Sequence, residues 1–123
     1  MEFDNNRPIY LQIADGIEER ILSGGFTPGD RIPSVREWGA TIGVNPNTVA
    51  RSYDVLSERG IIENKRGIGF FVRADARESI LALRRKEFID TELPEFIRKA
   101  ELLGIDLEIK FRNTTASVSK QPL

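Results

Sequence analysis

The sequence contains neither cysteine nor histidine. Without cysteine, the chain forms no disulfide bond and offers no thiolate ligand to a metal ion. Without histidine, it also lacks the commonest general base and the nitrogen ligands of zinc sites. We therefore do not expect an enzyme, and the sequence indicates no metal and no cofactor.

Long apolar segments are absent as well, since no run approaches the ~18 residues that a transmembrane helix requires. The N-terminal residues Met1 to Asp4 also lack the charged and then apolar arrangement of a signal peptide. With 123 residues, of which 40% are hydrophobic, the chain has the size of one domain, or of a small domain with an appendage. We expect a cytoplasmic protein.

A net positive charge, common in nucleic-acid binders, is missing too, because the formal net charge is −1. The charges are nevertheless unevenly distributed. Residues 31–73 carry seven basic and four acidic side chains, whereas residues 1–30 carry two basic and six acidic ones. An excess of this size also arises by chance, but it makes the middle of the chain the candidate surface for nucleic acid.

Four isoleucines at four-residue spacing predict the first helix. They are Ile9, Ile13, Ile17 and Ile21. Pro8 suits the first turn of this helix, and Ser23-Gly24-Gly25 suits its end. The pattern is amphipathic, so the isoleucines are expected in the core. The carboxylates of Glu18 and Glu19 are expected on the exposed face beside arginines, as a solvated surface and not a catalytic pair.

Two further helices follow, separated by a tight turn. Ser34 and Glu37 have the spacing of a capping box, which begins a short helix. Asn45 then caps a helix that has Pro46 in its first position and runs to about Arg59. A short helix, a tight turn and a second helix are typical of a helix-turn-helix.

Two apolar segments around a glycine-containing connection predict a β-hairpin. Residues 61–64 and 70–72 are the expected strands, and residues 65–69 form the connection between them. Three helices followed by a hairpin have the order of a winged helix-turn-helix, in which the hairpin is the wing. We therefore predict an α+β fold, with a winged helix-turn-helix domain in residues 1–75.

Beyond that domain the composition changes to charged, helix-forming residues. One helix is expected from residue 76 to about 90, a second from about Pro94, and a third short one after Asp106. Residues 76–113 are predicted to be a short all-α dimerisation segment, because helix pairing across a two-fold axis would bury their apolar stripes. The alternative is that these helices fold back on the N-terminal domain. Residues 114–123 are polar and predicted to be disordered.

The apolar side chains of this segment define the expected dimer interface. They are Ile80, Leu83, Phe88, Phe96, Ile97 and Leu103. So few residues are not expected to enclose a ligand pocket of ~300 Å³ by themselves. The sequence therefore assigns no small-molecule effector.

The first turns of the third helix carry side chains suited to reading DNA bases. In a helix-turn-helix this part of the second helix enters the major groove. Asn47, Thr48 and Arg51 lie there, and asparagine can pair bidentately with adenine as arginine does with guanine. Ser34 and Arg36, at the start of the preceding helix, are expected to lie near the DNA backbone.

The hairpin connection is the second candidate contact with double-stranded DNA. Lys65 and Arg66 would enter or flank the minor groove, and Gly67 would permit a close approach. Each feature has an ordinary alternative: a helix cap, a solvated loop, or an Arg51 paired with Asp54 or Glu58. Their joint placement on one side of a winged helix favours DNA binding over a winged-helix module that contacts only proteins.

Residues 8–72 resemble the GntR family of bacterial regulators almost without a gap. The motifs that carry the resemblance are Pro8 to Ile13, Pro28 to Glu37, Val44 to Val49, Tyr53, Leu56, Gly60 and Gly67 to Val72. The Asn-Pro-Asn-Thr-Val form and the short C-terminal segment resemble the YtrA subfamily. This resemblance implies a homodimer held by C-terminal helices that represses transcription from a palindromic operator, often at transporter operons and at its own gene.

The resemblance also implies a set of DNA contacts at matching positions. These are Ser34, Arg36, Asn45, Asn47, Thr48, Arg51, Arg66 and Gly67. Two departures from the family pattern stand out. Trp38-Gly39 replaces the usual Leu-Ala of the second helix, and Ala50 stands where some relatives carry an arginine that contacts DNA.

Overall fold

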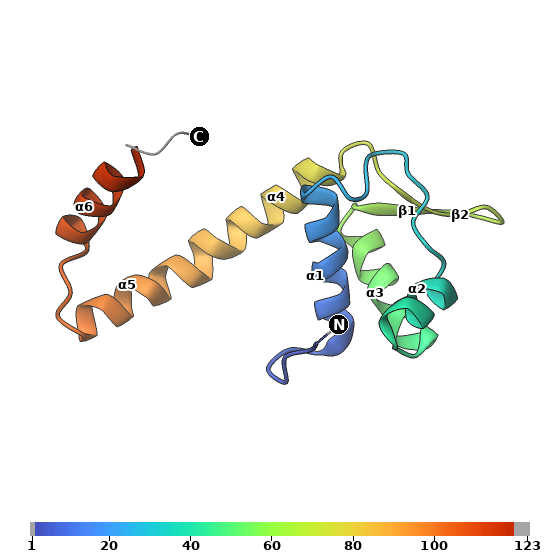
Figure 1. The fold of residues 1–123 in the computed structure, drawn as a ribbon, viewed down its shortest axis with the longest axis horizontal. Coiled ribbons are helices and arrows are strands. Elements are labelled where there is room, and N and C mark those ends of the chain that lie inside the picture. The colour runs from blue at the N-terminus through green and yellow to red at the C-terminus, as the bar shows by residue number, and fades with distance from the viewer. Residues whose placement is uncertain (1, 120–123) are drawn as a thin grey trace. The chain divides into compact units, whose positions relative to one another are not determined.

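The structure is a computed structural model that describes residues 2–119, with the side chains of residues 2–114. Its elements in order are α1 (Ile9–Leu22), α2 (Val35–Ile42), α3 (Pro46–Glu58), β1 (Ile62–Lys65), β2 (Gly69–Val72), α4 (Ala76–Glu87), the π-helical turn η1 (Phe88–Glu92), α5 (Leu93–Leu102) and α6 (Leu107–Ser119) (Figure 1). This order confirms the predicted α+β fold with a winged helix-turn-helix. Among the described residues, no helix is long and apolar enough to cross a bilayer.

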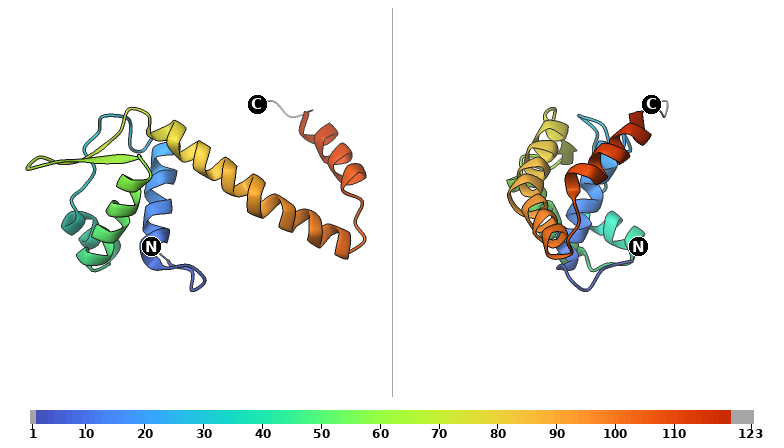
Figure 2. Two further views of the ribbon diagram at one scale, coloured as in Figure 1. Left: turned by 180° about the vertical axis from the view of Figure 1, so that it is seen from behind. Right: turned by 90° about the vertical axis from the view of Figure 1, so that its left-hand side faces the viewer.

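The core of the winged helix lies between α1 and α3, which run side by side in Figures 1 and 2. The isoleucines at positions 13, 17 and 21 are buried there, as their spacing predicts, against Val49, Tyr53 and Leu56. Ile9, at the start of α1, was expected in the core too but is 45% exposed. Each fully buried side chain of this size stabilises the fold by about 1.5–3 kcal/mol. This core fixes the position of α3.

The two strands of the wing are antiparallel and pair Ile62 with Val72 at the base. The segment before α2 continues this sheet. Gly29 N–H donates to the Val72 carbonyl, and Ile32 N–H donates to the Phe70 carbonyl, each at 2.9 Å. The wing is therefore attached directly to the segment that leads into α2.

Helix α4 begins inside the core of the winged helix. Ala76 and Ile80 are fully buried in that core. Ile80 therefore does not belong to the exposed apolar set that was expected at a dimer interface. For the same reason the first compact unit of the chain extends to Leu83, beyond the predicted border at residue 75, and the second unit starts at Arg84.

Pro94 does not begin a separate helix, because α4, η1 and α5 follow one another without a loop. Proline cannot donate to the carbonyl four residues earlier, and its ring crowds that carbonyl. The π-helical turn accommodates this defect: its closing bond runs from Leu93 N–H to the Phe88 carbonyl, one residue further than in an α-helix. The expected break at Pro94 is thus a local change of helical pitch.

Helix α6 begins directly after Asp106, as predicted, and Asp106 Oδ1 accepts a hydrogen bond from Ile109 N–H at 3.3 Å. It continues to Ser119, so the structure differs from the predicted disorder over residues 114–119. A helix satisfies its own backbone hydrogen bonds, and the missing apolar stripe therefore does not prevent it from forming. Residues 120–123 of that prediction lie outside the described residues.

A cavity of about 420 Å³ lies between α5 and α6, within the second unit. Its lining is largely apolar and includes Phe96, Leu103 and Leu107. The rings of Phe96 and Phe111 stack across it with centroids 6.3 Å apart. This cavity is open to solvent on one side, so the expectation that the segment does not enclose a ligand pocket by itself stays a prediction.

Trp38 and Gly39 determine how α2 packs: Trp38 contacts Phe26 and Arg20, and Gly39 lies against the turn that follows the helix. The Trp38 ring is buried and meets Phe26 edge to face with centroids 6.3 Å apart, while the Arg20 guanidinium lies over it at 4.7 Å. A Cβ atom on Gly39 would lie only 2.6 Å from the Val44 carbonyl oxygen. The missing side chain therefore lets the turn of the helix-turn-helix close against α2.

The substitution Gly39→Ala is expected to destabilise the fold by about 1–3 kcal/mol, because the added methyl group meets backbone that cannot move aside cheaply. Helix propensity alone predicts the opposite sign, with a gain of about 1 kcal/mol. Urea unfolding measures the difference. Ala40→Gly, at the exposed neighbouring position, is the control for propensity, and a more stable Gly39→Ala variant would contradict the close approach.

Candidate nucleic-acid interface

The first turns of α3 present the predicted base-reading side chains to solvent. Asn47 and Arg51 are exposed, and Thr48 is half-buried. The Asn45 amide oxygen accepts a hydrogen bond from Asn47 N–H at 2.8 Å, so this side chain holds the helix start in place. Its amide N–H₂ group remains available as a donor. The free N–H groups of this helix end and its partial positive charge also suit a phosphate.

The start of α2 contributes Ser34 and Arg36. Ser34 Oγ accepts from Glu37 N–H at 3.1 Å, and the Glu37 carboxylate accepts from Ser34 N–H at 3.3 Å, which confirms the predicted capping box. Hydrogen bonding by the Ser34 side chain and backbone lowers the pKa of Glu37. Both the hydroxyl and the N–H group of Ser34 thus interact with Glu37 in the absence of DNA. Arg36 is exposed within the same first turn of α2.

The tip of the wing projects away from the helices (Figure 2). Ile68 N–H donates to the Lys65 carbonyl at 2.8 Å and closes the tip. Gly67 has φ 78°, a value that residues with a side chain rarely adopt. Lys65 Nζ lies 4.5 Å from the Phe71 ring centroid, and Arg66 is exposed beside it. The predicted wing residues are therefore gathered at one exposed tip.

The cations of these three elements are not neutralised by neighbouring carboxylates. Arg36, Arg51, Lys65 and Arg66 are all exposed. Within the part of the chain that the structure describes, none of the four takes part in an ion pair. Their charge is therefore available to phosphates although the chain as a whole is slightly acidic.

Arg51 contacts an aromatic ring and not a carboxylate. Its guanidinium carbon lies 3.9 Å from the centroid of the Tyr10 ring, which comes from the first turn of α1. The alternative, a surface ion pair of Arg51 with Asp54 or Glu58, is therefore not what the structure shows among its described residues. Sequence reasoning missed Tyr10 as a member of the site, since nothing in the spacing of two residues so far apart indicates that they meet.

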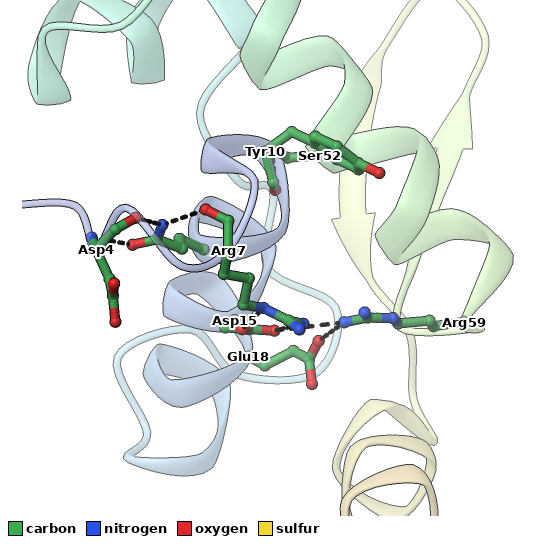
Figure 3. Close-up of polar contacts among 8 residues, drawn as sticks. Asp4, Arg7, Tyr10, Asp15, Glu18, Ser52 and Arg59 are labelled. Atoms are coloured by element: carbon green, nitrogen blue, oxygen red, sulfur yellow. Dashed lines mark hydrogen bonds and ion pairs between the residues drawn. The ribbon is translucent and has the colours of Figure 1, made fainter. Parts of the chain in front are cut away.

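Two polar contacts hold α3 against α1. Near the N-terminal end of α1, Ser52 Oγ donates to the Tyr10 carbonyl oxygen at 2.6 Å (Figure 3). At the other end Arg59 forms an ion pair with Glu18 and lies 3.7 Å from Asp15. Glu18 was expected on the exposed face of its helix, but it is 2% exposed. The buried face of α1 is thus wider than the isoleucine stripe, and the arginine balances the charge that it includes.

The segment before α2 is tied to α3 as well. The Tyr53 hydroxyl donates to the Pro33 carbonyl oxygen at 2.6 Å, and burial raises the pKa of this tyrosine well above its usual range. The hydroxyl therefore stays protonated and remains a donor. Together with the contacts to α1, this bond fixes α3 relative to the start of α2.

Comparisons with known proteins agree with this geometry. Residues 9–72 match the family model described as bacterial regulatory proteins, gntR family. The uncharacterized HTH-type transcriptional regulator YhcF of Bacillus subtilis is 40% identical over 108 residues, which are 87% of each chain. The HTH-type transcriptional repressor YtrA of the same organism is 38% identical over 104 residues, which are 85% of this chain and 79% of YtrA.

A crystal structure of a GntR-family protein from Bacteroides thetaiotaomicron is similar with a TM-score of 0.78 at 42% identity. The likeness covers 93% of this chain and 99% of that one, and so includes the C-terminal helices. The relatives YhcF and YtrA are transcriptional regulators, which confirms the expectation that this chain is not an enzyme.

The substitution Arg59→Ala is expected to lower the free energy of unfolding by about 2–3 kcal/mol, because it removes the arginine that is paired with the buried Glu18 carboxylate. Arg7→Ala is the matched control, since Arg7 forms an exposed pair with Asp15 at 3.0 Å and its loss should cost less than about 1 kcal/mol. Chemical denaturation of both variants gives the two values. Equal losses would contradict the role assigned to the buried pair.

Proposed function

Because this chain belongs to the GntR family of bacterial regulatory proteins, the family that its motifs resemble, we propose that it represses transcription as a homodimer bound to a palindromic operator. It is a DNA-binding transcriptional regulator, as its relatives are. The observation that carries the proposal is the set of exposed, unpaired cations on α2, α3 and the wing. Repression is inferred from the relative YtrA, a transcriptional repressor. A regulator that binds bacterial promoters acts in the cytoplasm, and we propose that location for this protein.

In the proposed complex, α3 lies in the major groove. Arg51 pairs with a guanine and Asn47 with an adenine, each contributing roughly 1–3 kcal/mol of discrimination against the wrong base. Thr48 contacts the same base edges or the adjoining phosphate. Asn45 fixes the start of the helix and donates its amide hydrogens to the DNA backbone. It reads no base in this proposal, because its amide oxygen is bonded to Asn47 N–H.

The remaining contacts set the register of the protein on the duplex. Ser34 and Arg36 bind phosphates at the start of α2, while Lys65 and Arg66 enter or flank the minor groove. Gly67 brings the wing tip close to the sugar edges because it has no side chain. Contacts to phosphate and sugar position a protein without reading sequence, so specificity is expected to come from α3.

Dimerisation is proposed for the second unit and the end of α4. The exposed apolar side chains Leu83, Phe88, Phe96, Ile97 and Leu103 support it. The cavity between α5 and α6 offers an apolar surface that a second copy of the chain can fill. A two-fold dimer would carry two α3 helices, one for each half-site of a palindrome, and half-sites read in this way lie about one helical turn apart.

A winged-helix module that contacts only other proteins is the competing function. Such a module has no use for free cations at the wing and the recognition helix, which this chain retains. Binding to DNA at low salt, with an affinity that falls steeply as the salt concentration rises, separates the two functions. If duplex DNA is not bound even at low salt, the competing function is the better one.

Arg51→Ala and Lys65→Ala are expected to affect DNA binding differently. Loss of Arg51 should relax the preference at one base pair, whereas loss of Lys65 should weaken binding to all sequences alike and reduce the salt dependence by about one phosphate contact. Fluorescence anisotropy with a set of single-base operator variants measures both effects. A uniform loss of affinity in both variants would contradict the assigned roles.

Phe96→Asp and Leu103→Asp are expected to convert the dimer into a monomer, because each places a charge in the proposed apolar interface. Leu102→Asp is the matched control, since Leu102 is exposed on the same helix but does not line the cavity. Sedimentation equilibrium gives the dissociation constants. If all three variants remain dimeric, the proposed interface is contradicted, and neither it nor the cavity holds the dimer together.

A further inference from the structure

Tyr10 combines two contacts with α3 that no packing requirement explains. Its ring lies under the Arg51 guanidinium, with 3.9 Å between the guanidinium carbon and the ring centroid. Its backbone carbonyl accepts from Ser52 Oγ at 2.6 Å, and Figure 3 shows these two residues side by side. Arg51 and Ser52 are consecutive residues of the recognition helix. One residue of α1 thus contacts both the Ser52 hydroxyl and the Arg51 guanidinium.

The ring of Tyr10 is not needed by the core. Tyr10 is half-buried. It belongs neither to the cluster of buried side chains between α1 and α3 nor to the partly buried side chains that pack on that cluster. Its hydroxyl makes no hydrogen bond within the described residues. Tyr53 provides the contrast, because it is buried in that cluster and its hydroxyl is bonded to the Pro33 carbonyl.

A ring face is a suitable support for a side chain that must read a base. The guanidinium group is planar, and its N–H donors point outward in that plane. Stacking on a ring occupies the face of the group and leaves the donor edge free for a bidentate bond to guanine. An ion pair with Asp54 or Glu58 would instead occupy the donors that the base requires.

We propose that Tyr10 is a positioning residue that holds the Arg51 guanidinium ready to contact a base. The inference rests on the proposed role of Arg51 as a base reader. A side chain that is ordered before binding loses less conformational entropy in the complex. Loss of the ring is therefore expected to reduce discrimination at the base pair read by Arg51 by about two- to five-fold, the range of an exposed cation–π contact.

The test is a double-mutant cycle with the full-length protein. A preferred site is first selected by the unaltered protein from a pool of random-sequence duplexes. Affinities for this site and for its single-base variants are then measured for Tyr10→Phe, Tyr10→Leu, Arg51→Ala and the double variant Tyr10→Leu/Arg51→Ala. Thermal unfolding of each variant shows whether the winged helix is intact, and comparing only ratios between sequences removes general losses of affinity.

The expected result has three parts. Tyr10→Phe keeps the ring and retains the preference, Tyr10→Leu loses it by the stated factor, and Tyr10→Leu has no further effect on the preference once Arg51 is alanine. The proposal is overturned if Tyr10→Phe loses as much as Tyr10→Leu, because the hydroxyl then contacts DNA directly. It is also overturned if Tyr10→Leu lowers affinity for all sequences equally in the presence and absence of Arg51.

The outcome for Arg51→Ala separates this inference from the function on which it rests. If Arg51→Ala relaxes the preference at one base pair and Tyr10→Leu does not, the positioning role alone is wrong. If Arg51→Ala changes no preference, the base-reading role of Arg51 is wrong, and the positioning role is overturned with it.

Discussion

The arrangement of the site depends on how α3 is docked on α1. Isoleucines of α1 supply the apolar contact, and two polar contacts add to it: Ser52, in the middle of α3, bonds to the Tyr10 carbonyl, and Arg59, at the C-terminal end of α3, pairs with Glu18. Apolar packing alone tolerates some sliding or rotation of one helix on another. A hydrogen bond and a buried ion pair at separate points allow much less, because each is costly to break inside the protein. The exposed face of α3 is therefore held in one orientation.

The charges of this small acidic chain are divided by the same architecture. Carboxylates near α1 are engaged by Arg59 and Arg7, whereas the arginines and the lysine of α2, α3 and the wing have no acidic partner among the described residues. Two of these cations rest on aromatic rings, Arg51 on Tyr10 and Lys65 on Phe71. An aromatic contact restrains a cation without neutralising it. Net charge is consequently a poor guide to the partner of this protein.

Local signals in the sequence were sufficient for the elements of the winged helix. The capping box of Ser34, the Asn45-Pro46 helix start and the glycines of the hairpin each act over a few residues, and each is present in the structure. What sequence reasoning missed depends on contacts between distant residues. The burial of Glu18 requires Arg59, the place of Ile80 in the core requires the path of α4, and Tyr10 meets Arg51 only in the folded chain. The C-terminal helices differ from expectation for another reason, because a π-helical turn accommodates Pro94 and α6 extends beyond its apolar residues.

The central claim is that α2, α3 and the wing form the surface that binds DNA. Backbone amide NMR signals of the full chain, followed while duplex operator DNA is added, test this claim most directly. We expect the signals near Ser34 to Arg36, Asn45 to Arg51 and Lys65 to Gly67 to shift first and most. Shifts confined to α5 and α6, or shifts spread evenly over the chain, would contradict it.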